Sequence, residues 1–300
     1  MSSKIPFTLE FDFEYQKAQR LTPLIRRVIA RNPSPFTFKG TGTYILGHGS
    51  VAVIDPGPLV SEHIEALKFA LNKETVTHIL VTHTHMDHSP AAEPLKSYWG
   101  AKTYGYGPHG SDVMRKNSQL EEGSDFNFFP DIKLHHGDLI KGDDWTIEAL
   151  HTPGHTSNHI CYALHEENAL FTGDHVMGWS TSVIAPPDGN MTQYIESLEL
   201  LLDRSEDIYW PTHGTFITDV KRYVRGFIEH RLKREQQIVD CLQRGYTDIR
   251  SMVPKIYKDT DEALYSAAAR SVLSSMIRLV DTGRVLCEEN PSIHTQFTLK

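Results

Sequence analysis

The chain has 300 residues, of which 39% are hydrophobic and 23% charged, and its formal net charge is −8. This balance is ordinary for a soluble globular protein, and the length fits one large domain or one domain with an appendage. The charge is unevenly distributed: residues 1–218 hold 16 Lys and Arg against 27 Asp and Glu, whereas residues 219–300 hold 14 against 11. We therefore predict two domains, 1–218 and 219–300.

Nothing in the sequence predicts a membrane or secretory role. No apolar run approaches the ~20 residues that a membrane span requires, and residues 1–14 lack the hydrophobic stretch of a secretory signal. The three cysteines, Cys161, Cys241 and Cys287, follow neither a pairing pattern nor a metal-ligand spacing. Reduced, mostly buried thiols are the simplest interpretation, which predicts a cytoplasmic protein without membrane contact.

The first part of the chain predicts strands around a hairpin. Residues 15–39 contain four arginines, including Arg26 and Arg27, and we interpret them as a solvated basic segment that leads into the opening strand. Residues 40–47 and 50–55 then predict a hairpin. Ser61 is placed to cap a helix whose apolar positions recur at helical spacing.

The densest group of chemically active side chains is the motif His-Thr-His-Met-Asp-His. It contributes three imidazoles and one carboxylate within six positions, namely His83, His85, Asp87 and His88. The preceding apolar run, 76–81, predicts a buried strand, and Pro90 suits the first turn of a helix. The motif should therefore lie at the C-terminal end of a strand, where open α/β folds place their chemistry. Imidazole and carboxylate are the ligands expected of zinc and similar metals.

Three further strand-like runs end close to a histidine or an aspartate. The runs and their polar residues are 145–150 with His155, 169–173 with Asp174, and 208–212 with His213. Four strand ends that carry such side chains, in this order, form a constellation that a polar turn with several histidines does not explain.

This constellation resembles the metallo-β-lactamase superfamily of hydrolases. The resemblance implies a four-layer αββα sandwich of mixed α/β class, with metals between the sheet edges. It assigns one Zn²⁺ to His83, His85 and His155, a second Zn²⁺ to Asp87, His88 and His213, and a bridging role to Asp174. Mn²⁺ or Fe²⁺ could replace zinc at the oxygen-rich second site. Asp174 stands where true β-lactamases typically use Cys, which argues against antibiotic hydrolysis.

The resemblance also gives Asp55, which precedes Pro56-Gly57, the role of orienting the metal loop. An ordinary turn aspartate explains the residue types almost as well. His159 is either a contact behind the ligands or a core histidine. Glyoxalase II is disfavoured, because residues 211–215 replace its usual Cys-Gly-His-Glu-Tyr-Thr.

The segments between the motifs are less regular. Residues 105–140 suggest a long surface excursion that borders the active-site mouth, and its histidines, His109, His135 and His136, are expected to be solvated or structural rather than ligands. The loop after Asp174 must line the site. The residues on it that could contact substrate are His175, Ser180, Thr181 and Ser182, and the sequence does not decide among them.

The second domain predicts helices followed by a hairpin. A long amphipathic helix from residue 220 should end at Gly245, and a short helix follows at 249–256. Asp259 and Thr260 are placed to cap a third helix that runs to about residue 280. Two short strands, 284–287 and 295–299, complete a pattern that suggests a winged-helix unit.

Residues 230–238 and 256–260 resemble the winged-helix extension of the β-lactamase-like protein 2 branch. With the metal motifs, the resemblance covers about residues 36–290. Arg270 and Arg278 are the only basic residues on the third helix, too few to read a DNA sequence. We therefore expect this domain to shape substrate access or to form a homo-oligomer.

Paired metals predict a hydrolase in which a metal-bridging hydroxide attacks an ester-type bond, with Asp87 holding and relaying its proton. An acidic catalytic domain favours a small-molecule ester, thioester or lactone. Endoribonuclease cleavage of single-stranded RNA is the alternative that the branch resemblance supports, although residues 219–300 lack a dense basic surface. A purely structural metal site on a DNA-binding protein conflicts with seven potential ligands at two open ions.

Overall fold

The computed structural model describes residues 5–110 and 123–300 and contains two large β-sheets. The first sheet follows chain order: β1 Gln19–Arg20, β2 Ile25–Ile29, β3 Gly42–Leu46, β4 Ser50–Ile54, β5 Thr75–Leu80, β6 Lys102–Gly105 and β7 Ile132–Lys133. The first four strands pair antiparallel, which confirms the hairpin of β3 and β4, and β4 to β7 pair parallel. Helices α1, Ser61–Ala70, and α2, Ala92–Trp99, make the connections to β5 and β6.

The second sheet has the spatial order β12-β11-β10-β9-β8. Its strands are β8 Leu139–Lys141, β9 Thr146–His151, β10 Ile160–Leu164, β11 Ala169–Gly173 and β12 Ile208–Pro211. Strands β8 to β11 pair antiparallel, whereas β11 and β12 are parallel and are joined through α4, Met191–Leu202. The chemistry-bearing runs of the sequence are therefore strands β5, β9, β11 and β12.

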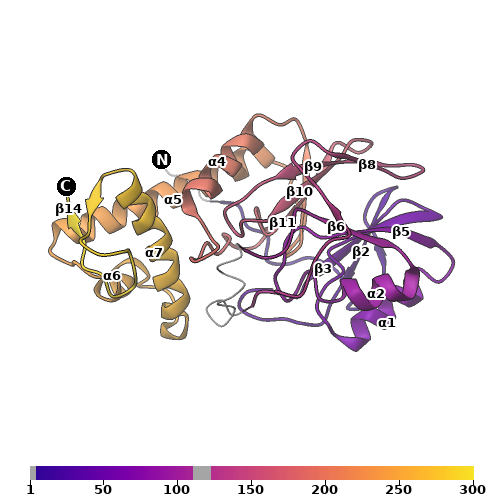
Figure 1. The fold of residues 1–300 in the computed structure, drawn as a ribbon, viewed down its shortest axis with the longest axis horizontal. Helices are drawn as coiled ribbons and strands as arrows, with labels where there is room; N and C mark the ends of the chain where they lie inside the picture. Colours follow the sequence, from indigo (N-terminus) through magenta and orange to yellow (C-terminus); the bar gives the residue numbers. More distant parts are fainter. Residues whose placement is uncertain (1–4, 111–122) are drawn as a thin grey trace.

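Alternating side chains divide the sandwich into layers. On β3, Tyr44 and Leu46 face the second sheet and pack with residues such as Phe171. Ile45, between them, packs instead with the apolar side of α1 and α2. Helix α4 and the first half of α5, Val220–Gln243, cover the outer face of the second sheet. The resulting αββα order confirms the predicted fold (Figure 1).

The C-terminal unit has its own core but shares α5 with the sandwich. Phe227 of α5 packs against the second sheet, whereas Ile238 and Leu242 pack with α6, Ile249–Ile256, and α7, Tyr265–Asp281. The hairpin of β13, Val285–Leu286, and β14, Thr298–Leu299, closes the unit (Figure 1). Because one helix serves both cores, the boundary between residues 218 and 219 stays a prediction.

Two predicted helix caps differ from the structure. Ser61 is the first residue of α1, and the capping position belongs to Val60, which makes no side-chain capping bond. Before α7, a short 3₁₀ turn, Glu262–Leu264, is capped by Asp261, whose carboxylate accepts from the Ala263 N–H at 2.9 Å. The cap therefore lies one residue after Thr260.

The prediction of a solvated basic segment was wrong for β2. Arg26 forms a half-buried ion pair with Glu74 at 2.6 Å, and Arg27 is buried and donates to the Gly214 carbonyl at 3.1 Å. Both arginines lie in a strand that the buried Ile25 and Val28 anchor. Specific acceptors on distant segments compensate the burial of these charges.

All three cysteines are free thiols, and Cys161 and Cys241 are buried, as predicted. Within residues 5–110 and 123–300, no helix is long and apolar enough to cross a bilayer.

Candidate metal centre

The loops that follow four strands bring together every side chain that the sequence nominated as a ligand. The loop after β5 carries His83, His85, Asp87 and His88, while β9, β11 and β12 lead to His155, Asp174 and His213 respectively. Within each of three groups the ligand atoms lie within 4.8 Å of one another: His83, His85 and His155; His83, His88 and Asp174; and Asp87, His88 and His213. All lie at one edge of the sandwich, between the two sheets.

The first group consists of three imidazoles. His83 Nε2 lies 3.0 Å from His85 Nδ1, and the same His85 nitrogen lies 3.1 Å from His155 Nε2. Ligands of a tetrahedral zinc ion with bonds of about 2.0–2.1 Å are separated by roughly 3.3 Å. The three nitrogens therefore have the spacing that one ion requires.

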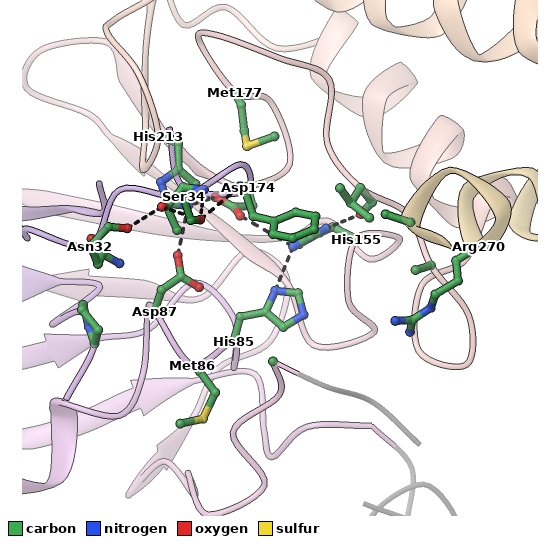
Figure 2. Close-up of a pocket in the computed structure, with 17 residues that line it drawn as sticks. Asn32, Ser34, His85, Met86, Asp87, His155, Asp174, Met177, His213 and Arg270 are labelled. Carbon is green, nitrogen blue, oxygen red and sulfur yellow. Dashed lines mark hydrogen bonds and ion pairs between the residues drawn. The ribbon is translucent and has the colours of Figure 1, made fainter. Parts of the chain in front are cut away.

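The group of Asp87, His88 and His213 mixes imidazole and carboxylate. Asp87 Oδ2 lies 3.1 Å from His213 Nε2 and 3.3 Å from His88 Nε2. Asp174 lies between the groups: its Oδ1 is 3.4 Å from His213 Nε2, and its Oδ2 is 3.7 Å from His155 Nε2. Asp174 can thus contact an ion in either group. Figure 2 shows Asp174 between His213 and His155.

Two buried atoms of the cluster lack a hydrogen-bond partner among the described residues, namely His88 Nε2 and Asp174 Oδ1. Buried polar atoms without a partner are costly and call for an explanation. Both atoms face the other candidate ligands, so a cation between the groups would satisfy them. The donor set, five imidazoles and two carboxylates, therefore fits a pair of divalent ions.

The ring nitrogens that face away from the cluster are also held, as is typical of metal-binding histidines. The contacts are His83 Nδ1 to Thr82 Oγ1 at 3.0 Å, His88 Nδ1 to Asp55 Oδ2 at 2.9 Å, His155 Nδ1 to the Val183 carbonyl at 2.6 Å, and His213 Nδ1 to the Gly40 carbonyl at 3.2 Å. These bonds fix the direction in which each opposite nitrogen points.

Asp55 holds the metal loop from behind. Besides His88, its carboxylate accepts from the Thr82 N–H at 2.7 Å, the Thr82 hydroxyl at 2.8 Å and the Thr212 hydroxyl at 3.1 Å. The side chain is buried, and its backbone has a φ of +50°, which is unusual for a residue with a Cβ. Asp55 therefore connects the loops after β4, β5 and β12, which exceeds the role of a turn residue.

Electrostatics within the cluster favour a positive charge between its carboxylates. Burial and the neighbouring His88 hold the pKa of His83 well below its usual value. Burial acts in the same direction on His213, but Asp174 and Asp87 outweigh it and raise the pKa of His213 to about 10. Burial would raise the pKa of Asp87, yet the adjacent His88 and His213 hold it well below the usual range. Burial would also raise the pKa of Asp174, but His213 and His88 hold it well below its usual range, so the site favours the ionised form of both carboxylates and a cation between them.

Comparison with known proteins agrees with this geometry. The family model of the Metallo-beta-lactamase superfamily matches residues 37–213. The chain belongs to this superfamily. A second model, the Beta-lactamase associated winged helix domain, matches residues 249–290, so the predicted winged-helix unit is confirmed.

Curated relatives resemble the superfamily domain and the extension together. A Beta-lactamase-like protein 2 homolog from Caenorhabditis elegans is 32% identical over 284 residues, 92% of this chain and 90% of the relative. An atrochrysone carboxyl ACP thioesterase from Aspergillus chevalieri is 31% identical over 271 residues, 86% of this chain and 81% of the relative. The structure of a metallo-beta-lactamase family protein from Thermus thermophilus shares the fold, with a TM-score of 0.76 and 19% identity, and the match covers 94% of this chain and 100% of that one.

The loop that follows Asp174 is built differently from what its hydroxyl-rich sequence suggested. His175 is buried, and Tyr194 donates to its carbonyl at 2.8 Å. Ser182 is also buried and donates to the Asp174 carbonyl at 2.6 Å. Neither side chain lines the pocket over the metal centre, nor do Ser180 and Thr181; Val183 and Ala185 line it instead.

Two of the histidines outside the ligand set that the sequence singled out are buried beside the cluster, and two are exposed. His159 is buried behind the cluster, accepts from the Asp174 N–H at 3.3 Å and contacts Thr152 at 2.9 Å, so it is both a support and a core residue. His109 is buried, not solvated, and lies 2.9 Å from the Thr84 hydroxyl. His135 and His136 are exposed. Of the predicted surface excursion, residues 111–122 lie outside the described part of the chain.

The cluster of candidate ligands lies at the floor of a pocket of about 580 Å³. Its walls come mainly from residues 32–37, the loop at 177–185 and helix α7. The sequence predicted that the loop after Asp174 lines the site and that the C-terminal domain shapes substrate access, whereas it did not connect residues 32–37 with the site. The residues that line the pocket around the candidate ligands are drawn in Figure 2: Asn32, Ser34, Phe36, Thr37, Pro58, Met86, Gly123, Met177, Val183, Ala185, Ala267 and Arg270. The signal in the sequence that could have indicated the contribution of α7 to the pocket was Arg270, one of only two basic residues on that helix.

Proposed function

We propose that this superfamily hydrolase cleaves thioester bonds of small molecules with the help of two divalent metal ions. The observation that carries the proposal is the placement of the cluster at the floor of a largely apolar pocket, which His85, Asp87, His155, Asp174 and His213 line directly. Phe36, Met86, Met177 and Val183 provide walls that suit an acyl chain or ring, since ligand pockets are mostly apolar with a few convergent polar groups. The similarity to a relative named as a thioesterase supports this choice among ester-type bonds.

His83, His85 and His155 would hold the first ion, and Asp87, His88 and His213 the second, with Asp174 between them. We propose zinc, because imidazole-rich sites with carboxylates suit it; Mn²⁺ and Fe²⁺ are the alternatives for the oxygen-richer second group. Two bound ions would supply a water of lowered pKa and positive charge opposite the developing oxyanion.

Asp87 is suited to move the proton of this reaction. Its Oδ2 contacts His213 and accepts from the Thr41 hydroxyl at 3.0 Å, which holds the carboxylate in place. About a quarter of the side chain is exposed, at 24%, so it faces the pocket. As water attacks the thioester carbon, Asp87 would accept its proton, the carbon–sulfur bond would break, and the proton would pass to the departing thiolate.

The pocket is a poor match for an RNA strand. Apart from histidines, Arg270 is the one basic residue among the described residues that line it. Proteins that hold RNA combine phosphate-binding cations with several aromatic surfaces for stacking, whereas Phe36 is the one phenyl, phenol or indole ring in this described lining. RNA cleavage is therefore the competing outcome of the test.

The direct test is a parallel assay of metal-loaded protein on N-acetylcysteamine thioesters, matching oxygen esters, lactones and an unstructured RNA. We expect thioesters to give the highest kcat/KM and elemental analysis to find two metals per chain. Faster cleavage of RNA, or a metal content that stays below one after reconstitution, would contradict the proposal.

A further inference from the structure

Helix α7 contributes to the metal-site pocket although it belongs to the C-terminal unit. Ala267 and Arg270 are three residues apart, so they lie on the same face of the helix, and both line the pocket. Figure 2 shows Arg270 reaching from the helix on the side of His155, with its guanidinium directed toward His85. The pocket is thus closed on one side by the winged-helix unit.

The guanidinium of Arg270 is only partly engaged by protein. Its Nη2 donates to the Pro186 carbonyl at 3.1 Å, and it makes no ion pair within the part of the chain that the structure describes. Arg278, two turns later on α7, shows the contrast, because its Nη1 donates to both carboxylate oxygens of the buried Glu235 at 2.7 and 2.8 Å. Arg278 is committed to the core of the unit, whereas Arg270 retains donors that face the pocket.

The charges of the residues that line the pocket favour an anionic partner for Arg270. Its described acidic lining residues, Asp87 and Asp174, belong to the metal cluster, where ions would neutralise them. The remaining described lining residues other than the histidines are neutral apart from Arg270. A half-buried guanidinium among apolar walls binds carboxylate or phosphate in a forked geometry that ammonium or water cannot reproduce.

We propose that Arg270 is a specificity-determining residue that binds an anionic group of the substrate while the scissile thioester lies at the metal centre. This inference rests on the proposed thioesterase function and adds the charge of the substrate. The anion is either a carboxylate on the acyl part or a phosphate on the thiol part, since both suit the same fork. The winged-helix unit would then recognise the substrate with α7, without reading nucleic acid.

Three thioesters separate these possibilities. The 4-carboxybenzoyl and 4-carbamoylbenzoyl thioesters of N-acetylcysteamine have the same shape but differ in the charge of the acyl part. Benzoyl coenzyme A instead places phosphates on the thiol part. Each would be assayed with the wild type, Arg270→Gln, Arg270→Lys and the control Arg250→Gln, which removes an exposed arginine of the same unit.

Arg270→Gln should lower kcat/KM about tenfold or more for the anionic substrate that the fork recognises, and by less than about twofold for the neutral carbamoyl thioester. Arg270→Lys should fall between, and Arg250→Gln should match the wild type. Calorimetric binding of the free product terephthalate, compared with its monoamide, provides a readout that does not depend on turnover when the carboxylate is the recognised group.

Loss on the carboxylate substrate places the anion on the acyl part, and loss on the coenzyme A substrate places it on the thiol part. Equal losses on all three thioesters, or no loss on any, would overturn the role of Arg270. If the wild type cleaved none of the thioesters, the proposed function itself would fail, which is a distinguishable result.

Discussion

The floor and the rim of the pocket are built by different physical means. On the floor, five imidazoles and two carboxylates are largely buried, and four of the rings are fixed from behind by an oxygen atom. At the rim, Phe36 and Met86 are 54% and 49% exposed, and Arg270 donates to a single acceptor among the described residues. The candidate ligands at the floor are therefore held in fixed positions, as catalysis requires. The rim side chains, which would contact the rest of the substrate, have fewer contacts that fix their conformation.

The C-terminal unit shows the same contrast within itself. Arg231 of α5 is buried, donates to the Ser182 carbonyl and lies 5.1 Å from the Tyr194 ring, so it fixes the loop whose Val183 carbonyl holds His155. Arg270 of α7, on the same unit, faces the pocket instead. One unit thus supports the floor through α5 and shapes the rim through α7. The following predictions test this division.

The largest effect should come from Asp174→Ala, because Asp174 contacts members of both candidate metal groups. We expect activity to fall by more than ~10³-fold, since charge stabilisation at both ions would be lost. Activity, metal content and circular dichroism would be measured together. The fold should persist, because the sandwich core lies elsewhere.

Asp143→Ala, at an exposed position, is the matched control for this change. His109→Ala is not a suitable control, although His109 is not a candidate ligand, because its ring is buried beside Thr84. Equal loss in Asp174→Ala and Asp143→Ala would show that the cluster is not the metal centre.

Asp55→Asn should have the next largest effect. The amide keeps the size of the side chain but loses the charge and one acceptor oxygen that orient His88 and the Thr82 loop. Removing such a supporting group typically weakens metal affinity by about 10–100-fold. Competition with a chelator should show this loss at the group of His88. Asp131→Asn, at a carboxylate that pairs with Lys96 of α2 at 2.7 Å and contacts none of the candidate ligands among the described residues, should leave the affinity unchanged.

His63 tests the support behind the floor through pH. It is buried, lies 2.9 Å from the Thr43 hydroxyl, and burial lowers its pKa to about 4. The unfolded chain therefore takes up the proton first, so the stability contribution is present above about pH 6.5 and is lost as pH falls toward 4. The stability advantage of the wild type over His63→Gln should shrink by about 2 kcal/mol between pH 7 and 5.

Denaturant unfolding of both proteins in chelator would measure this difference, because protonation of the metal ligands then cancels between them. The His63 ring packs beside Gly57, whose N–H donates to the His88 carbonyl at 2.8 Å. His63 therefore supports the turn behind the loop that carries His83 to His88. A stability difference that is independent of pH would show that His63 titrates normally in the folded protein.

The sequence predicted the sandwich and the positions of the candidate ligands because both follow from local patterns. Apolar strands that end in His or Asp place those side chains at the same edge of two sheets, and the structure brings all of them together. Helix α6 was predicted with its exact bounds, Ile249–Ile256, and the C-terminal hairpin of β13 and β14 was predicted as well, whereas α7 begins at Tyr265, later than its predicted cap.

What the sequence did not predict depends on contacts between distant segments. Arg27 was predicted to be solvated because no partner for its guanidinium was evident close to it in the sequence. In the structure, the guanidinium donates to the Gly214 carbonyl and lies 5.2 Å from the Phe11 ring. The part that residues 32–37 play at the rim was missed for the same reason, because Phe36 reaches the pocket only through tertiary packing. The predicted positions of the two helix caps were wrong by one or two residues, because several neighbouring side chains could serve as the cap.

The smallest effect should come from the cap of the turn before α7, and it separates the rim from the floor. Asp261 accepts from the Ala263 N–H, so Asp261→Ala should destabilise the C-terminal unit by about 1 kcal/mol. Asp259→Ala, at the cap position that the sequence suggested, should change stability by less, because the structure gives Asp259 no capping bond. Hydrogen exchange would locate the loss in α7, and metal affinity should stay unchanged in both variants. A drop in metal affinity in Asp261→Ala would show that α7 supports the floor as well as the rim.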